Sequence, residues 1–293
     1  MIIEKMTDLI GNTPMLKIPE EVHGLKNVDL YAKMEMMNPY GSIKDRTAWG
    51  MIRDDLEELQ KNRKTIFENS SGNTAKALQA IAGPRGIHVR LVTGLAQVDT
   101  QKEMILHLGS DIEEFASAND CFDPSDPNDP QFLIQKAVQE QPNEIYFPSQ
   151  FTNDKNPDIH YHETAEEILS DVGNVDYFFA GLGTSGSSLG ITKRLRDANP
   201  ELQSIGITSE KNHFIPGIRS MDQMWESGLF LQKNYQDMFP LKERPVIEEM
   251  LGLNRRLGLL CGPSSAANYL GSVQYLRERC ETFTERKVAV FLA

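Results

Sequence analysis

The sequence predicts an α/β fold in which helices cover a mostly parallel sheet. Two observations lead to this prediction: short runs of apolar, β-branched or aromatic residues recur along the chain, and helical patterns lie between them. Parallel strands are usually buried on both faces and therefore read as continuous apolar runs. With 293 residues, 40% of them hydrophobic, the chain can form one large domain or two smaller ones.

Seven short runs are expected to form the strands. Each contains β-branched or aromatic residues, which are common in the strands of a buried sheet. These runs are residues 28–34, 65–67, 89–93, 145–147, 177–180, 205–208 and 288–292.

Between these runs, apolar residues recur three or four positions apart, which indicates amphipathic helices. Helices on the faces of the sheet would bury their apolar sides against it. The residues with this spacing are Ala48, Met51, Ile52, Leu56 and Leu59, then Ala75, Leu78, Ile81 and Ala82, then Ile191 and Leu195 before Pro200.

Composition argues against several classes of function. The 30 Lys and Arg residues are outnumbered by 42 Asp and Glu residues, and a net charge of −12 disfavours binding to nucleic acid or to an anionic membrane. No run approaches the 18 apolar residues of a membrane span, and no signal peptide is recognisable. Cys121, Cys261 and Cys280 are odd in number and widely separated, so we expect reduced thiols, no metal site and a cytoplasmic protein.

A glycine-rich segment, residues 177–190, runs from an expected strand into an expected helix. Glycines allow backbone amides to approach an anion, and a helix N-terminus adds unpaired donors and a favourable dipole. The hydroxyls of Thr184, Ser187 and Ser188 suit the oxygens of a terminal phosphate. The segment therefore predicts a phosphate site, with Gly183, Thr184, Ser185, Gly186 and Ser187 as its candidate residues.

The same segment allows a second interpretation. Gly181, Gly183 and Gly186 fit the dinucleotide fingerprint, and Glu210 follows about twenty residues later, where a ribose-binding acid would lie. An NAD-dependent oxidoreductase therefore remains an alternative. Against it, the segment lies past the middle of the chain, whereas the simplest dinucleotide-binding domain opens with its fingerprint.

Two further segments carry polar residues at the start of a helix. Residues 68–74 leave a strand through Ser70, Ser71, Gly72, Asn73 and Thr74, and such a corner can bind a carboxylate or can be an ordinary helix cap. Ser42 and Asp45 resemble a capping box, which places Lys44 in a first helical turn. A cation there opposes the helix dipole, and the dipole together with burial should lower the pKa of the amine and keep it nucleophilic.

Taken together, these segments resemble the fold-type II pyridoxal-phosphate enzymes of the cysteine synthase and cystathionine β-synthase family. The resemblance runs in order over nearly the whole chain, and residues 216–222 look most like cysteine synthase B and O-phosphoserine sulfhydrylase. The matching segments are 9–15, 38–46, 70–74, 150–153, 183–187 and 262–265.

The resemblance implies a role for each matching residue. Lys44 would hold pyridoxal phosphate as a Schiff base, Asn73 would reach its ring oxygen, and Ser264 would meet its ring nitrogen. The loop 183–187 would bind its phosphate. The substrate would be bound by Ser70, Ser71, Gly72, Asn73, Thr74, Gln150 and Arg219.

The expected reaction is β-replacement on an activated L-serine, either O-acetylserine or O-phosphoserine, with sulfide or another sulfur donor. It would give L-cysteine through an α-aminoacrylate. A sister reaction, such as synthesis of cystathionine or of a diaminopropionate precursor, would use the same residues. The partners implied are a small-molecule amino acid, a sulfur donor and a second copy of the chain in a homodimer.

The resemblance also implies two domains, each with a central, mostly parallel sheet flanked by helices. The smaller domain would comprise residues 1–15 and 38–150, and the larger would comprise residues 16–37 and 151–293. Three residues depart from the family pattern: Ser70 replaces a commoner threonine, and Ala75 and Ser185 replace commoner glycines. These small-for-small changes leave substrate choice more open than cofactor binding.

Overall fold

The computed structural model describes residues 2–70, 72–93, 99–115, 126 and 129–293. Clustering of contacts divides the chain into two compact units. Unit 1 comprises residues 1–10 and 38–156, and unit 2 comprises residues 11–37 and 157–293. Residues 11–15 thus lie with unit 2, and residues 151–156 lie with unit 1.

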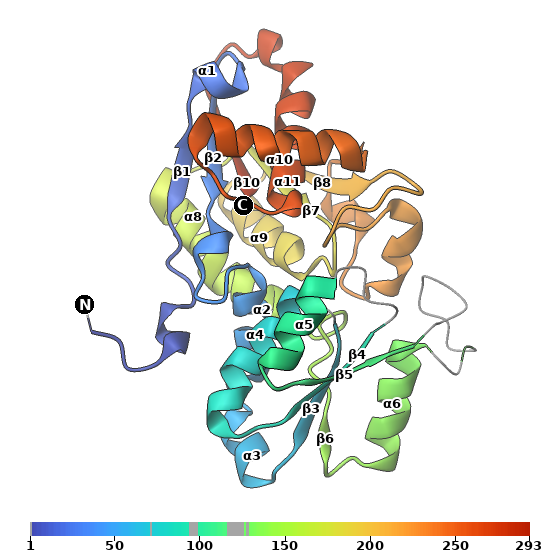
Figure 1. Ribbon diagram of the computed structural model, residues 1–293. Coiled ribbons are helices and arrows are strands. Elements are labelled where there is room, and N and C mark those ends of the chain that lie inside the picture. The colour runs from blue at the N-terminus through green and yellow to red at the C-terminus, as the bar shows by residue number, and fades with distance from the viewer. Residues whose placement is uncertain (1, 71, 94–98, 116–125, 127–128) are drawn as a thin grey trace. The chain divides into compact units, whose positions relative to one another are not determined.

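Unit 1 is built on a four-stranded parallel sheet with the order β5-β4-β3-β6. Side chains alternate across each strand, so Ile66 of β3 packs with α2 and α4, whereas Phe67 packs with Ile134 of α6 on the other face. Figure 1 shows α6 alone on one side of these strands. The elements are α2 (Lys44–Ile52), α3 (Leu56–Lys61), β3 (Thr65–Asn69), α4 (Asn73–Ala82), β4 (Val89–Thr93), α5 (Asp99–His107), β5 (Asp111–Glu114), α6 (Pro130–Glu140) and β6 (Ile145–Tyr146).

Unit 2 is built on a six-stranded sheet with the order β1-β2-β10-β7-β8-β9. β1 is antiparallel to β2, and every other neighbouring pair is parallel. The elements are β1 (Met15–Ile18), α1 (Glu20–His23), β2 (Val28–Lys33), α8 (Ala165–Val172), β7 (Tyr177–Gly181), α9 (Gly186–Ala198), β8 (Gln203–Ser209), β9 (Asp237–Leu241), α10 (Glu243–Leu257), α11 (Pro263–Arg277) and β10 (Lys287–Leu292). α7 (Lys155–Ile159) crosses the boundary of the units and continues into a π-helix, His160–Thr164.

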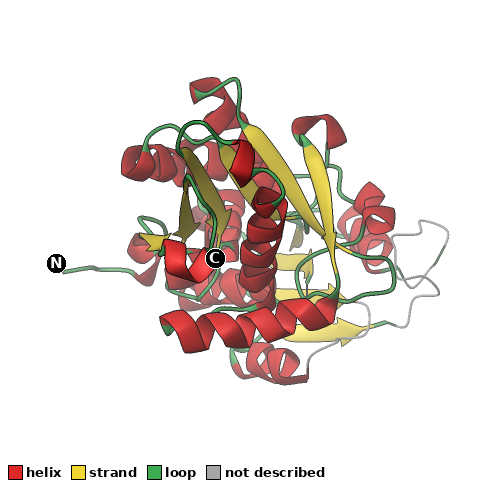
Figure 2. Ribbon diagram, turned by 90° about the horizontal axis from the view of Figure 1, so that it is seen from above, coloured by secondary structure: helices red, strands yellow, loops and turns green. Residues whose placement is uncertain are grey.

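Helices cover both faces of the unit 2 sheet. Ile205 and Ile207 of β8 share a core with α10 and α11, whereas Ser204 of β8 hydrogen-bonds Thr192 of α9 on the opposite face. Figure 2 shows strands flanked by helices in this way. The predicted α/β class, with mostly parallel sheets flanked by helices, is therefore confirmed.

All seven predicted strands are present, and the structure adds β1, β5 and β9. These three are edge strands of their sheets. An edge strand is less buried and need not be apolar, so β5 reads Asp-Ile-Glu-Glu and β9 contains Pro240. Neither segment has the continuous apolar run that marked the inner strands.

The helical pattern of residues 48–59 forms two helices. α2 ends at Ile52, and α3 begins at Leu56 after a turn at residues 53–55. Met51, Ile52, Leu56 and Leu59 are nonetheless all buried in the same core. The apolar spacing predicted burial correctly and did not reveal the break.

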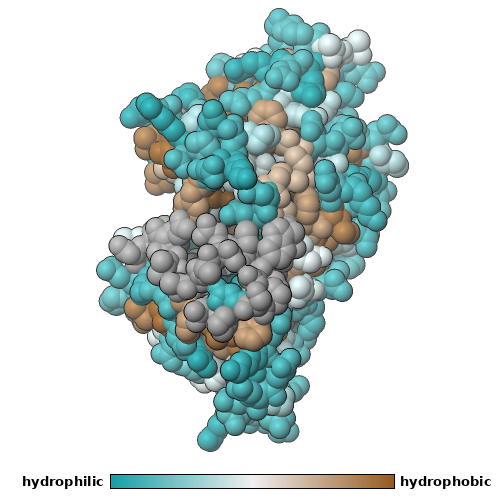
Figure 3. Space-filling view, turned by 90° about the vertical axis from the view of Figure 1, so that its right-hand side faces the viewer, coloured by the Kyte–Doolittle hydropathy of each residue, from teal (hydrophilic) through white to brown (hydrophobic). Residues whose placement is uncertain are grey.

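Hydrophilic side chains cover most of the face in Figure 3, and smaller hydrophobic areas lie among them. Within the described residues, no helix is both long enough and apolar enough to span a bilayer.

Candidate functional site

Lys44 is the first residue of α2, as the sequence predicted. Its backbone N–H donates to the Ser42 hydroxyl at 3.2 Å. Burial of the amine lowers the pKa of Lys44 to about 8, although the residue as a whole is partly exposed. About one in ten amines with this pKa is uncharged at pH 7, a far larger share than for an ordinary lysine, and the uncharged amine is the form that attacks an aldehyde.

The predicted capping box at this helix is wrong. The residue before α2 is Ile43, which is already helical and makes no side-chain cap. Asp45 instead accepts the backbone N–H of Tyr40 at 2.7 Å, five residues back. Gly41, with φ at +88°, turns the chain sharply between these two residues and displaces the cap from the spacing that the motif requires.

The corner between β3 and α4 contains the predicted carboxylate site. The Ser70 hydroxyl accepts the N–H groups of Gly72 at 3.4 Å and of Ala75 at 3.2 Å. This leaves the hydroxyl proton of Ser70 available for an anion. Asn73 opens α4 and is exposed, and Ser71 lies outside the described residues.

Gln150 joins this corner from the segment that follows β6. Its Oε1 accepts the Thr74 hydroxyl at 2.8 Å, and its Nε2 donates to the Asn69 carbonyl at 2.9 Å. One Nε2 hydrogen remains for a ligand. Thr74 and Gln150, which were predicted separately to bind substrate, thus contact each other within unit 1.

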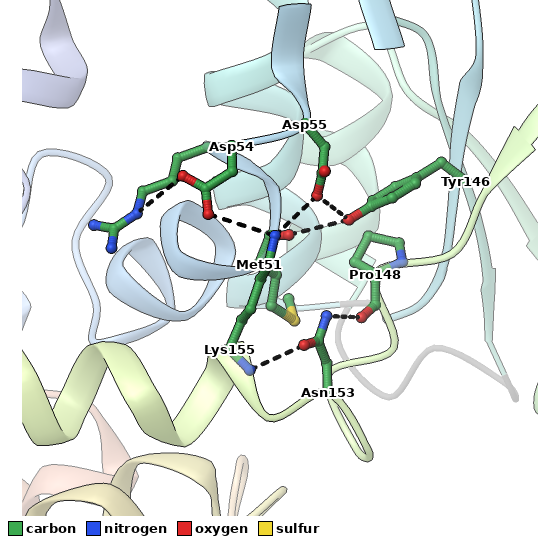
Figure 4. A network of polar contacts seen from close by, with 8 residues as sticks. Met51, Asp54, Asp55, Tyr146, Pro148, Asn153 and Lys155 are labelled. Carbon is green, nitrogen blue, oxygen red and sulfur yellow. Dashed lines mark hydrogen bonds and ion pairs between the residues drawn. The ribbon is translucent and has the colours of Figure 1, made fainter. Parts of the chain in front are cut away.

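Ionic and polar contacts fix the segment that carries Gln150 (Figure 4). Lys155 contacts Asp55 at 3.1 Å and Asp54 at 3.5 Å, and Tyr146 donates to Asp55 at 2.7 Å. Asn153 donates to the Pro148 carbonyl at 2.7 Å. Burial and the Asp55 carboxylate raise the pKa of Tyr146, so its hydroxyl remains a donor.

The predicted phosphate loop lies in unit 2 between β7 and α9. Ser185 has φ at +67°, a left-handed conformation that favours glycine, and this explains why the resemblance led us to expect glycine there. The Ser185 hydroxyl is buried and has no hydrogen-bond partner among the described residues. An orphaned hydroxyl at the start of a 13-residue helix is available to an anion.

Two residues that support this loop were not predicted to do so. Tyr235 contacts the Ser188 hydroxyl at 2.6 Å, and Ser188 in turn donates to the Ser185 carbonyl at 3.1 Å. Burial raises the pKa of Tyr235 to about 12, although the hydrogen bond with Ser188 opposes the shift. Tyr235 is 47 residues from Ser188, so no local pattern could reveal the contact.

A second segment of unit 2, residues 215–220, lies against the loop. The Arg219 N–H donates to the Leu182 carbonyl at 2.8 Å, and the Ser209 N–H donates to the Arg219 carbonyl at 3.0 Å. A Cβ on Gly183 would lie 2.8 Å from the Gly217 carbonyl oxygen, so this position requires glycine. The Arg219 guanidinium is half-buried and donates to the Gln223 carbonyl at 3.1 Å.

Ser264 and Glu210 are both partly exposed residues of unit 2. Ser264 is partly exposed in the first turn of α11, a helix of 15 residues. Glu210 follows β8 and lies 3.9 Å from Lys242 on a partly exposed surface. The structure thus places Gly181, Gly183 and Gly186 after one strand and Glu210 after the next, as a dinucleotide site also requires, so geometry alone does not separate the two cofactors.

The residues of each unit fit pyridoxal phosphate. In unit 1, a buried lysine amine with a lowered pKa is available for the aldehyde. In unit 2, an orphaned buried hydroxyl and a helix N-terminus are available for the phosphate, and the partly exposed Ser264 can meet the ring nitrogen. Within the described residues, no group of His, Cys, Asp and Glu side chains could hold a metal ion.

Comparisons with known proteins decide between the cofactors. A family model described as pyridoxal-phosphate dependent enzyme matches residues 6–293. Cysteine synthase from Aquifex aeolicus is 28% identical over 94% of this chain and 84% of the relative. Cystathionine beta-synthase from Apis mellifera is 32% identical over 99% of this chain, which spans 59% of that longer relative.

A solved structure is similar along the full chain. The O-acetylserine dependent cystathionine beta-synthase from Helicobacter pylori has a TM-score of 0.85 at 25% identity, over 100% of this chain and 95% of that chain. The family predicted from the ordered motifs is confirmed, and the NAD alternative is not supported.

Proposed function

Because this chain belongs to the pyridoxal-phosphate dependent enzyme family, we propose that it replaces the β-substituent of an activated L-serine with sulfur to give L-cysteine. The observation that carries the proposal is the buried amine of Lys44, whose pKa is lowered to about 8. Such an amine can bind an aldehyde and can also accept a proton near neutral pH. Cysteine synthase and cystathionine beta-synthase among the relatives support this class of reaction.

The family resemblance implies which residues would hold the cofactor. Lys44 would bind its aldehyde carbon, residues 183–187 its phosphate, and Asn73 and Ser264 the ring oxygen and ring nitrogen. When bound, pyridoxal phosphate supplies an electron-withdrawing ring that stabilises negative charge on the Cα atom of an amino acid. Lys44 would remove the Cα proton once the amino acid has displaced its amine.

Ser264 limits the reactions that are open to the enzyme. A neutral hydroxyl opposite the ring nitrogen does not keep that nitrogen protonated, so electron withdrawal is moderate. This favours loss of the β-substituent over transamination. The Ser70 hydroxyl and the remaining Nε2 hydrogen of Gln150 would hold the substrate carboxylate, together with Ser71, Gly72, Asn73 and Thr74.

An absorption spectrum tests this proposal. Cofactor-loaded wild-type protein should show a band near the edge of the visible range, and Lys44→Ala should lack it. Absence of the band from loaded wild-type protein would refute the role of Lys44. O-acetylserine, O-phosphoserine and serine, added in turn, should then identify the substrate by the spectral change that each produces.

Arg219 is our candidate for distinguishing between activated serines. Its guanidinium is half-buried beside the glycine loop and donates to the Gln223 carbonyl at 3.1 Å, and a guanidinium can bind a phosphate through two parallel N–H groups. Arg219→Ala should therefore reduce turnover of O-phosphoserine about tenfold or more, with a smaller loss for O-acetylserine. Equal losses for the two substrates would remove Arg219 from substrate selection.

Cystathionine synthesis is the second candidate, and the two relatives with this activity favour it. It differs only in the sulfur donor, homocysteine in place of sulfide. Competition between these two donors at equal concentration distinguishes the reactions.

We also propose a cytoplasmic homodimer. The separated cysteines and acidic composition support the compartment, and the family resemblance supports the assembly. Sedimentation velocity tests the homodimer: a monomer at micromolar concentration would contradict it.

A further inference from the structure

Glu68 is a buried carboxyl group directly behind the predicted carboxylate corner. It is the fourth residue of β3, and its exposed fraction is 0%. Its Oε1 accepts the N–H of Asn69 at 3.1 Å, and its Oε2 is buried without a hydrogen-bond partner among the described residues. By strand alternation, its side chain lies on the face of Ile66, which packs with α2 and α4.

Asn69 connects Glu68 to the carboxylate corner. Its N–H is held by Glu68, and its carbonyl is held by the Gln150 amide at 2.9 Å. Both backbone polar groups of Asn69, the residue before Ser70, are therefore fixed. Glu68 of β3 holds the N–H, and Gln150 after β6 holds the carbonyl. A change in the charge or position of Glu68 would therefore shift Asn69, and with it Ser70 and Gln150.

The carboxyl group is neutral over much of the physiological range. Burial raises the pKa of Glu68 to about 8, and the backbone groups of Asn69, Gln150 and Ser149 oppose this shift only partly. A buried charge without a counterion is costly, so a carboxyl in this position keeps its proton.

The upward shift of the Glu68 pKa arises from burial, and no charged side chain is among its causes. Arg90 on the adjacent strand points to the other face, where it lies over Phe67 and binds Glu113. The charged residues of α2 and α4, which pack on the Glu68 side, are Lys44, Asp45, Arg46 and Lys76.

We propose that Glu68 is a positioning residue whose neutral form holds the Asn69–Ser70 turn ready for the substrate carboxylate, and whose ionisation weakens carboxylate binding. The inference rests on the proposed role of Ser70, Asn73, Thr74 and Gln150. Two physical effects act together. An ionised Glu68 repels a second carboxylate at close range, and a buried charge draws backbone N–H groups away from the ligand.

Propionate is a suitable probe, because it carries the carboxylate without an amino group and needs no cofactor. Its dissociation constant is measured by calorimetry from pH 6 to pH 9.5 on cofactor-free, full-length protein. The Lys44→Met background is used, since the free amine of Lys44 also titrates near pH 8. Propionamide serves as an uncharged probe of the same shape.

In the Lys44→Met background, the dissociation constant of propionate should be nearly constant below pH 7 and reach about ten times that value by pH 9. Adding Glu68→Gln keeps the acceptor for Asn69 and removes the ionisation, so the rise should disappear. A rise that persists in the double variant, or no rise in Lys44→Met, would overturn the proposal. Propionamide binding should not depend on Glu68 ionisation in either protein.

A second measurement guards against a variant that fails to fold. Infrared spectroscopy of wild-type protein should show a protonated carboxyl band at pH 7 that disappears as the pH passes 8. Absence of this band at pH 7 would contradict the neutral form of Glu68. If propionate does not bind at pH 7, the carboxylate site itself is overturned. If cofactor-loaded wild-type protein lacks the absorption band, the proposed reaction is refuted, and the propionate test still applies.

Discussion

Replacing Ser185 by glycine should make the cofactor-free protein more stable and weaken its cofactor binding. Ser185 has φ at +67°, and a left-handed conformation costs a non-glycine residue roughly 1–2 kcal/mol. Glycine removes this strain but costs roughly 0.5–1 kcal/mol in backbone entropy. It also removes a buried hydroxyl without a partner among the described residues, whose desolvation costs about 1–3 kcal/mol.

The sum is a gain of about 3 kcal/mol in the free energy of unfolding of the cofactor-free protein. The loss appears on binding. A hydrogen bond from a hydroxyl to a charged phosphate contributes about 1.5–3 kcal/mol, so the dissociation constant of pyridoxal phosphate should rise about tenfold to a hundredfold. Urea unfolding measures the first quantity, and titration of the cofactor-free protein with pyridoxal phosphate measures the second.

Asn212→Gly is the matched control. Asn212 is exposed in unit 2, has φ at +66° and lies outside the loop, so its replacement should change stability by less than about 0.5 kcal/mol and leave cofactor affinity unchanged. If Ser185→Gly proves no more stable than the wild type, the strain argument is refuted. Unchanged affinity in Ser185→Gly would exclude its hydroxyl from phosphate binding.

Two further predictions concern the amine and the loop. In cofactor-free protein, the pKa of Lys44 is about 8 when folded and 10.5 as its ordinary value, so the unfolded state binds more protons between these limits. The free energy of unfolding of the wild type should therefore rise with pH through this window. Below pH 8, Lys44→Met should be more stable than the wild type by up to roughly 3 kcal/mol. Lys61→Met, which changes an exposed lysine, should not show this gain. Tyr235→Phe removes the contact with Ser188 and should cost about 1 kcal/mol together with several-fold in cofactor affinity. Tyr161→Phe, which loses a surface bond to Asp197, should leave affinity unchanged, and equal losses in both variants would argue against Tyr235 as a support of the loop.

The inner strands could be predicted because burial on both faces makes them continuous apolar runs. Val89–Thr93 was predicted with its bounds, whereas the edge strand Asp111–Glu114 was invisible because its residues are mostly acidic. The break between α2 and α3 was also missed, since Leu56 continues the apolar spacing across the turn. Periodicity reports which side chains are buried, and it does not report where the backbone bends.

Motif residues could be predicted where the chemistry is local. Lys44 and the loop 183–187 lie at helix starts that the sequence marks with serine and glycine. The supports of those motifs could not be predicted, because Tyr235 meets Ser188 across 47 residues and Gln150 meets Thr74 across 76. The proposed role of Glu68 depends on its burial. From the sequence, a single acidic residue in an apolar strand can be either a buried, protonated carboxyl group or an ionised carboxylate at the exposed edge of the sheet.

The strand order of unit 2 has a consequence for synthesis of the chain. β10 lies between β2 and β7 in the sheet, so the β1-β2 pair and the β7-β8-β9 group are joined only by residues 287–292. All four strands of unit 1 have been made by residue 146. Unit 1 can therefore complete its sheet early in translation, whereas the facing edges of β2 and β7 in unit 2 stay unpaired until residues 287–292 have been made. Those open edges make unit 2 the part of the nascent chain most exposed to aggregation.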